Sequence, residues 1–288
     1  MKLTLEDHDE RLFGKILARQ AEDIPDTPFL VTDQASISFG EAEAETNRLA
    51  AGLAALDIGA GDRVVLYLSN RPEMVLLALA INKLSAIWVP INTDYRGAWL
   101  ADAIVGSKPQ LVITEMALAG RLDDPEEQVR VVVMDDDQGT LPAGAIPYPV
   151  LREHAGHPPD YSSQHYGDTC AILWTSGTTG KSKGVMQSYN NWIRAIVGGA
   201  SIAYDSAADD ICYCPLPLYN SAAWLTCIYR ALIEGIPCVI DSKFSVSQFW
   251  DRINKFGATQ TFALGAMGAF LMAQPEPVSY THLTLPTS

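Results

Sequence analysis

The strongest constraint on the fold is a regular alternation of helix and strand patterns between residues 38 and 115. Ser38 followed by Glu41 forms a capping-box pattern, and Leu49, Leu53 and Leu56 then recur at helical spacing. Strand patterns follow in DRVVLYLS (62–69), AIWVPIN (86–92) and QLVITE (110–115), separated by helix patterns at 73–85 and 98–108. Such a repeated βα unit predicts an α/β fold in which helices cover a mainly parallel sheet.

A second α/β pattern follows residues 120–168, a stretch of acidic runs, prolines and glycines with one isolated strand pattern. Further strand patterns lie at 170–175, 211–214, 236–240 and 259–264. Between them we predict one helix capped by Ser188, one ending at Gly235, and one capped by Ser245 and closed by Gly257. We therefore predict two subdomains, residues 1–168 and residues 169–277, the second of them incomplete.

The last eleven residues, VSYTHLTLPTS (278–288), do not continue this pattern. They resemble the read-through translation of a transposase-type sequencing adapter, so we interpret them as an artefactual tail and exclude them from the fold. On this interpretation the helix pattern after Gly265 stops without a partner, and the chain is expected to be cut short. The alternative is an ordinary frayed terminus.

Composition excludes several functions. A net charge of −14 argues against a nucleic-acid or anionic-membrane surface, because both partners attract extended positive potential. No apolar stretch approaches membrane-spanning length and no signal peptide is present, so we expect no integral membrane segment and a cytoplasmic location. The five cysteines lie in apolar surroundings without a Cys-x-x-Cys pair, which predicts buried reduced thiols.

The segment TSGTTGKSKG (residues 175–184) is the clearest candidate for binding a phosphate. Its glycines let backbone amides approach a ligand, and its hydroxyls can donate to phosphate oxygens or coordinate magnesium. Lys181 and Lys183 add positive charge in an otherwise acidic chain. A tight solvated turn in a hairpin is the simpler alternative. This stretch is called the glycine-rich segment below.

A P-loop is the first functional interpretation, because GKS at 180–182 is its usual ending. That motif requires a glycine where this chain has Thr175, and a helix that begins at the lysine. Here the helix pattern starts only near Ser188. The P-loop interpretation therefore fails on both requirements.

Residues 174–184 resemble the signature of the adenylate-forming superfamily, which includes acyl-CoA synthetases, peptide-synthetase adenylation domains and luciferases. The family pattern, aromatic-Thr-Ser-Gly-Thr-Thr-Gly-x-x-Lys-Gly, matches from Trp174 through Gly184. Residues 30–274 are similar to the family's N-terminal region in the order and spacing of segments, and PLPLYNSAAW (215–224) lies where the family has a Pro-Leu-aromatic-His turn. The resemblance implies the family's large N-terminal domain, with αβαβα layers, in incomplete form.

The resemblance implies ATP-dependent activation of a carboxylic acid to an acyl-adenylate, followed by transfer to coenzyme A, with Mg²⁺ as the metal cofactor. Lys183 and Thr175 are the implied catalytic residues. The implied nucleotide contacts are Thr175, Ser176, Gly177, Thr178, Thr179, Gly180 and Lys183. Position 181 varies in the pattern, and no residue of this chain is assigned as a metal ligand.

The acyl group is predicted to lie against Tyr219, Asn220, Trp224, Gly265, Ala266 and Met267. The alternative for these side chains is ordinary core packing. The region 245–275 is most similar to carnitine/crotonobetaine–CoA ligases. Asn220 replaces the histidine of the aromatic turn and Tyr189 replaces a histidine that often follows the signature, so the acyl specificity of the family does not transfer directly.

Several family segments are absent from this chain: the Tyr-Gly-x-Thr-Glu segment with its magnesium glutamate, the adenine and ribose segments, and the C-terminal domain with its catalytic lysine. We therefore expect the 288-residue chain alone to be inactive in adenylation. Three alternatives stay open: an amino-acid adenylation domain of the same superfamily, a P-loop-like NTPase, and a non-catalytic nucleotide-binding module.

Overall fold

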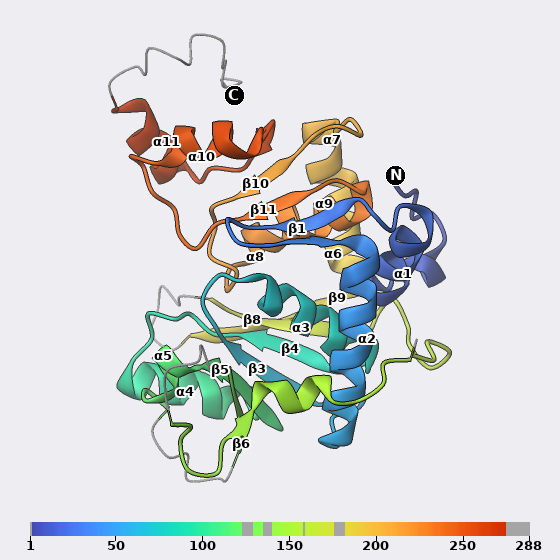
Figure 1. Ribbon diagram of the computed structural model, residues 1–288, viewed down its shortest axis with the longest axis vertical. Coiled ribbons are helices and arrows are strands. Elements are labelled where there is room, and N and C mark those ends of the chain that lie inside the picture. Colours follow the sequence, from blue (N-terminus) through green and yellow to red (C-terminus); the bar gives the residue numbers. More distant parts are fainter. Residues whose placement is uncertain (1, 123–128, 135–139, 158, 176–181, 275–288) are drawn as a thin grey trace.

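A computed structural model describes residues 2–122, 129–134, 140–157, 159–175 and 182–274 (Figure 1). The strands are β1 (Pro28–Val31), β2 (Ser36–Ser38), β3 (Arg63–Tyr67), β4 (Ile87–Pro90), β5 (Leu111–Glu115), β6 (Arg130–Met134), β7 (Ile146–Pro147), β8 (Thr169–Thr175), β9 (Lys183–Ser188), β10 (Cys212–Cys214), β11 (Cys238–Ile240) and β12 (Gln260–Thr261). The helices are α1 (Phe13–Asp23), α2 (Phe39–Ala55), α3 (Pro72–Lys83), α4 (Gly97–Ser107), α5 (Met116–Ala119), α6 (Tyr189–Ala195), α7 (Ser201–Tyr204), α8 (Ser221–Ala223), α9 (Tyr229–Glu234), α10 (Phe249–Phe256) and α11 (Gly265–Met272). Short helical turns are η1 (His8–Glu10), η2 (Tyr148–Arg152), η3 (Ile196–Ala200) and η4 (Trp224–Ile228).

The larger sheet has seven strands in the order β7-β6-β5-β3-β4-β8-β9. Its neighbours are parallel except for β8 and β9, which pair antiparallel at one edge. The mainly parallel sheet predicted from the βα repeat is therefore confirmed. Because the parallel strands end at one edge, the end of β8 lies at the same edge as the ends of β3, β4 and β5.

The smaller sheet has five strands in the order β12-β10-β11-β1-β2. The N-terminal hairpin β1-β2 joins it through a parallel pairing of β1 with β11. Strands β8 and β9, which follow residue 168, belong to the larger sheet instead. Each sheet thus draws on both sides of the predicted boundary at residue 168, and the division into subdomains there stays a prediction.

Helices form three layers around the two sheets. One apolar cluster joins both sheets to α1, α2, α3, α6 and α9, which lie between the sheets (Figure 1). A second cluster packs α4 and α5 on the outer face of the larger sheet, and a third packs α10 and α11 on the outer face of the smaller one. In β3, Val64 and Leu66 face the central layer while Val65 and Tyr67 face α4. The expected αβαβα layering is confirmed.

Helix ends agree with the sequence in most places. The Ser38–Glu41 capping box at α2 is formed in both directions, the Ser188 hydroxyl accepts a hydrogen bond from the Asn191 amide, and α10 ends at Gly257. The predicted cap at Ser245 is wrong, because α10 begins at Phe249. The Ser245 hydroxyl instead lies 3.4 Å from that of Ser247 in the preceding turn.

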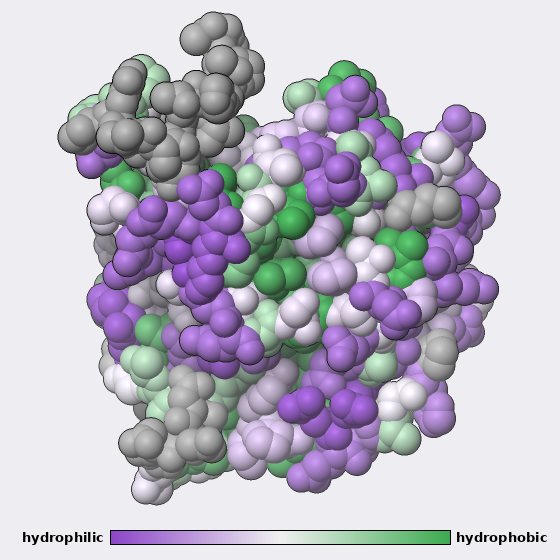
Figure 2. Space-filling model, turned by 45° about the horizontal axis from the view of Figure 1, so that its top comes forward, coloured by the Kyte–Doolittle hydropathy of each residue, from purple (hydrophilic) through white to green (hydrophobic). Residues whose placement is uncertain are grey.

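The polarity of the surface agrees with the composition. Figure 2 shows hydrophilic side chains over much of one face, with apolar side chains mainly near its centre. In the described part of the chain, no helix is long and apolar enough to cross a membrane. All five cysteines are buried and free, as predicted, and burial raises the pKa of the Cys170 thiol.

We predict that Gly52 in α2 cannot be replaced by alanine without loss of stability. A methyl group there would lie 2.1 Å from the carbonyl oxygen of Leu151, which packs on α2 from η2. Although alanine favours helices by about 1 kcal/mol, the overlap should lower the free energy of unfolding of Gly52→Ala by about 1–3 kcal/mol.

The matched control for this prediction is Gly268→Ala in α11. Among the described residues, no atom outside the helix's own backbone lies within 4 Å of its added Cβ, so the control variant should keep or gain stability. Urea unfolding measures both variants. A Gly52→Ala protein at least as stable as the unsubstituted protein would contradict the close approach of η2 to α2.

Candidate active site

The two ends of the glycine-rich segment are held side by side. Thr175 ends β8 and pairs with Lys183, the first residue of β9. The Thr175 hydroxyl donates a 3.3 Å hydrogen bond to the Lys183 carbonyl oxygen. Both residues are exposed, and within the described chain the Lys183 ammonium has no carboxylate partner. A hydroxyl and a free positive charge therefore meet at the carboxyl edge of the larger sheet.

The chain leaves the glycine-rich segment as a strand. Lys183 to Ser188 form β9, and the next helix starts at Tyr189. A P-loop needs a helix N-terminus at the lysine, so the rejection of that motif is confirmed. The predicted nucleotide contacts Ser176, Gly177, Thr178, Thr179 and Gly180 lie outside the described residues, as does Lys181.

The aromatic turn after β10 is fastened to the larger sheet by Asn70. The Asn70 amide nitrogen donates to the carbonyl oxygens of Leu216, at 2.8 Å, and Asp241, at 2.9 Å. Its amide oxygen accepts from the Leu218 backbone N–H at 2.8 Å. One side chain at the end of β3 thus holds both the turn and the end of β11.

This role of Asn70 is not apparent from the sequence. The sequence pattern marks Asn70, with Pro72 and Glu73, as a helix start, but the N-cap of α3 is Arg71 and no side chain caps it. Pro72 begins the helix without a backbone N–H, and the Asn70 side chain is left to reach the smaller sheet. The only signal was the position of a polar amide directly after a buried strand.

Tyr219 and Asn220 follow this anchored turn and are accessible. Tyr219 is half-buried, and burial together with the Asp94 carboxylate raises the pKa of its phenol. The segment after β4 that carries Asp94 and Tyr95 is therefore close to Tyr219. Asn220 is exposed and precedes α8 without a side-chain cap.

Trp224 belongs to the core between the sheets. Its exposed fraction is 0%, its ring centroid lies 4.2 Å from that of Trp88, and its indole N–H donates to the Leu218 carbonyl oxygen at 2.7 Å. The indole supports the turn from below, and its predicted contact with an acyl group stays untested.

Gly265, Ala266 and Met267 form the first turn of α11, beyond β12. Gly265 and Ala266 are exposed, and Met267 packs partly against the central core. Within the described residues, no hydrogen bond joins this group to the aromatic turn or to the ends of the glycine-rich segment. Among the described residues, Thr175 and Lys183 are the predicted site residues that two paired strands bring into direct contact.

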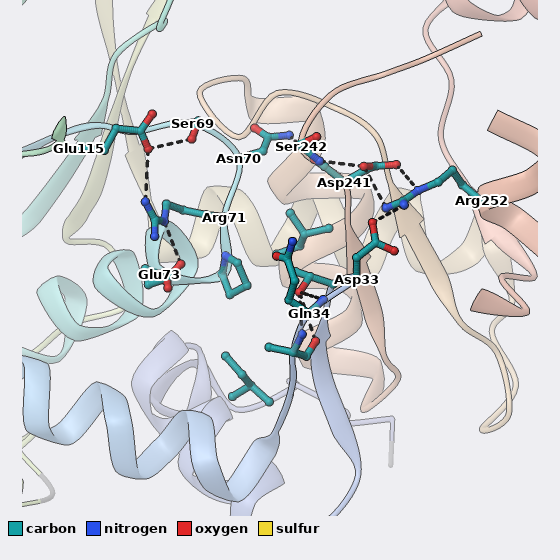
Figure 3. A pocket seen from close by; sticks show the side chains of 15 residues that line it. Asp33, Gln34, Ser69, Asn70, Arg71, Glu73, Glu115, Asp241, Ser242 and Arg252 are labelled. Atoms are coloured by element: carbon teal, nitrogen blue, oxygen red, sulfur yellow. Dashed lines mark hydrogen bonds and ion pairs between the residues drawn. The ribbon is translucent and has the colours of Figure 1, made fainter. Parts of the chain in front are cut away.

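A polar pocket of about 500 Å³ lies between the sheets and contains none of the predicted site residues (Figure 3). On one side Arg71 contacts Glu73 and Glu115, and on the other Arg252 contacts Asp33 and Asp241. Hydrogen bonds from Lys255 and Arg252 lower the pKa of Asp33. Its lining is given by Thr32, Asp33, Gln34, Ala35, Ile37, Ser69, Asn70, Arg71, Pro72, Glu73, Glu115, Ile240, Asp241, Ser242 and Arg252.

Two sheets covered by helices, with a lysine and a hydroxyl at the carboxyl edge of one of them, define a layered α/β protein, a class that binds ligands at that edge. A model of the family described as AMP-binding enzyme matches residues 17–286, and the chain belongs to this family. The resemblance drawn from residues 174–184 is confirmed at the level of the family.

Relatives and solved structures agree. The chain is 28% identical over 270 residues to the medium/long-chain-fatty-acid–CoA ligase FadD6 of Mycobacterium tuberculosis, covering 93% of this chain and 45% of that protein. The N-terminal domain of FACL13 from the same organism, solved with an inhibitor, has a TM-score of 0.78 and 26% identity over 92% of this chain and 65% of that one.

The o-succinylbenzoate–CoA synthetase MenE of Bacillus subtilis, solved with its acyl-adenylate intermediate OSB-AMP, has a TM-score of 0.75 and 25% identity over 89% of this chain and 50% of that one. The present chain spans less than half the length of FadD6. The finer resemblance to carnitine/crotonobetaine ligases is not among these findings and stays a prediction.

We predict that Asn70→Ala loosens the attachment of the aromatic turn. Losing three partly buried hydrogen bonds should lower the free energy of unfolding by about 2–3 kcal/mol. Asn254→Ala is the control, because this exposed asparagine of α10 makes no side-chain hydrogen bond among the described residues; it should change stability by less than about 0.5 kcal/mol. Equal urea midpoints for the two variants would argue against a stabilising role of the three Asn70 hydrogen bonds.

Proposed function

We propose that this chain forms the nucleotide- and acid-binding part of an acyl-CoA ligase. A carboxylate oxygen attacks the α-phosphorus of ATP, the bond to pyrophosphate breaks, and an acyl-adenylate results. The thiolate of coenzyme A then attacks the acyl carbon and AMP leaves. The observation that carries the proposal is the pairing of Thr175 with Lys183 at the carboxyl edge of the larger sheet, in a chain of the AMP-binding enzyme family.

The residues at this edge fit a polyphosphate. The Lys183 ammonium is exposed and can approach an anion without first breaking an ion pair among the described residues. The Thr175 hydroxyl is bonded only at 3.3 Å, so it can turn to donate to a phosphate oxygen. As pyrophosphate departs, negative charge grows on its oxygens, and Lys183 would stabilise that charge by position alone.

Magnesium enters the proposal bound to the phosphates of ATP, where it would share the charge of the leaving group. The described residues contain no group of three or more His, Cys, Asp or Glu placed to hold a metal ion. The hydroxyl of Thr175 is the protein ligand that this part of the chain can offer.

The acid is proposed to bind beside Tyr219 and Asn220, which are accessible. These two residues directly follow Leu218, whose backbone N–H is held by the Asn70 side chain. A tyrosine phenol is protonated at neutral pH and can donate a hydrogen bond, and burial, which raises the pKa of Tyr219, favours this form further. Gly265, Ala266 and Met267 are proposed as a second wall, carried by α11. Medium- and long-chain fatty acids are the first acids to test, since FadD6 is named for them; we propose a cytoplasmic site of action.

The experiment that tests the activity uses a gene product long enough to match the whole family. Pyrophosphate release is followed with ATP, Mg²⁺ and a panel of fatty, aromatic and carnitine-like acids, with and without coenzyme A. Acid-dependent release followed by CoA-dependent thioester formation is expected. Release that ignores the acid would contradict the proposal, and adenylate formation without thioester would assign the chain to the carrier-protein-dependent branch instead.

We predict that Lys183→Ala weakens acid-dependent pyrophosphate release by about 10- to 100-fold. Loss of one charged hydrogen bond costs about 1.5–3 kcal/mol, and about 1.4 kcal/mol corresponds to a factor of ten. The control is Lys243→Ala, which removes an equal charge from an exposed position after β11. If the two variants lose activity equally, net charge rather than contact explains the effect and Lys183 leaves the site.

A further inference from the structure

The indole of Trp174 is enclosed between α4 and β9 at the base of the glycine-rich segment. Trp174 is the residue before Thr175 in β8, and it pairs with Gly184 of β9. Its ring lies with Ile172 on the outer face of the sheet, while Leu173 faces the central layer. Since strand residues alternate, Thr175 lies on the face toward the smaller sheet.

One glycine makes room for this ring, and a second makes room for its neighbour Ile172. A Cβ at Gly106, in the last turn of α4, would lie 2.7 Å from the indole Cη2 and 3.2 Å from Cζ2. On β9, a Cβ at Gly184 would lie 2.9 Å from Cγ2 of Ile172 and 3.8 Å from the indole Cζ2. Heavy atoms at 2.7 Å overlap, so the present position of the ring requires glycine at 106.

The indole is also oriented by a hydrogen bond. Its Nε1–H donates to the Ser107 hydroxyl oxygen at 2.9 Å. That hydroxyl donates its own proton to the Ala103 carbonyl oxygen at 2.6 Å, and the Ser107 carbonyl accepts from Arg63 at 3.0 Å. Ser107 is buried, with an exposed fraction of 1%, so the acceptor is fixed in place. The ring is therefore defined both by shape and by direction.

We propose that Trp174 is a positioning residue, locked by Gly106 and Ser107, that sets where the Thr175 hydroxyl and the Lys183 ammonium meet the nucleotide. This inference rests on the proposed function of that edge. Thr175 follows Trp174 directly and Lys183 precedes its partner Gly184, so a shift of the paired backbone at Trp174 and Gly184 would move both groups. A tryptophan that only packs would affect stability alone, whereas a positioning residue affects nucleotide affinity as well.

The test is a double-substitution cycle in the same longer gene product that is used to measure pyrophosphate release. The variants are Gly106→Ala, Trp174→Phe and both together. Mg·ATP affinity is measured by calorimetry, thermal unfolding reports stability, and amide hydrogen exchange is followed in 169–175 and 183–188. Phenylalanine lacks the indole atoms nearest to Gly106, so it should relieve the overlap.

We expect Gly106→Ala to raise the ATP dissociation constant about tenfold and to speed exchange in β8 and β9 relative to β3. Ser107→Ala and Trp174→Phe should each raise it about threefold to fivefold, and the double variant should bind no worse than Trp174→Phe. The control is Trp99→Phe, which alters an indole in α4, the helix that also carries Gly106. Trp99 is 71% exposed, so its replacement should change neither the ATP dissociation constant nor the exchange rates.

Three outcomes would count against the inference, and each has a different meaning. In the first outcome, the unsubstituted protein binds ATP, and the variants Gly106→Ala and Trp174→Phe bind it with the same dissociation constant. The positioning role is then wrong while the nucleotide site stands. If the unsubstituted full-length gene product does not bind ATP, the proposed function of this edge fails and the positioning role falls with it. Variants that lose stability without a change in ATP affinity would reduce Trp174 to a packing residue.

Discussion

The enclosure of α3 between two sheets is the constraint on which the rest of the structure depends. Residues 74–83 of this helix are all buried, because the larger sheet covers one side and the other central helices and the smaller sheet cover the other. A helix that is apolar on all sides is unstable in water. Separation of either sheet from the other would therefore expose α3 to solvent at a cost in free energy. The relative placement of the sheets, and hence of the glycine-rich segment and the aromatic turn, follows from this shared layer.

Polar side chains in and next to α3 make hydrogen bonds and an ion pair that hold this helix in place. Lys83 has an exposed fraction of 1%; burial lowers its pKa, and its ammonium is held by the Glu43 carboxylate at 2.7 Å and the amide oxygen of Asn47. Asn82 donates to the carbonyl oxygen of Cys170 in β8 at 2.9 Å, and Asn70 just before the helix reaches the smaller sheet. Buried polar groups without partners are costly, so these contacts specify one arrangement of the layers.

The sequence predicted the elements better than their connections. The capping box at Ser38, the strand at β3 and the long apolar helix at α3 depend on local spacing, and all are present. The predicted helix cap at Ser245 is wrong. Its hydroxyl lies within hydrogen-bonding distance of the Ser247 hydroxyl, and serine side chains often make such local hydrogen bonds instead of capping a helix. The sequence did not predict that β1 pairs with β11 or that β8 belongs to the larger sheet. Pairing between strands far apart in the chain does not change the local periodicity of either strand.

By itself the sequence determined the α/β class, the family and the segment that is proposed to bind phosphate, because an eleven-residue signature and a helix-strand alternation are properties of neighbouring residues. Only the tertiary structure decided that Thr175 meets Lys183 across an antiparallel pair, that Trp224 lies in the core, and that Asn70 supports the aromatic turn. It also showed why residue 106 is glycine, since the indole of Trp174 occupies the space of the missing side chain. Apart from the Thr175–Lys183 pair of two consecutive strands, these contacts join segments far apart in the chain, and only the packing of the layers brings such segments together.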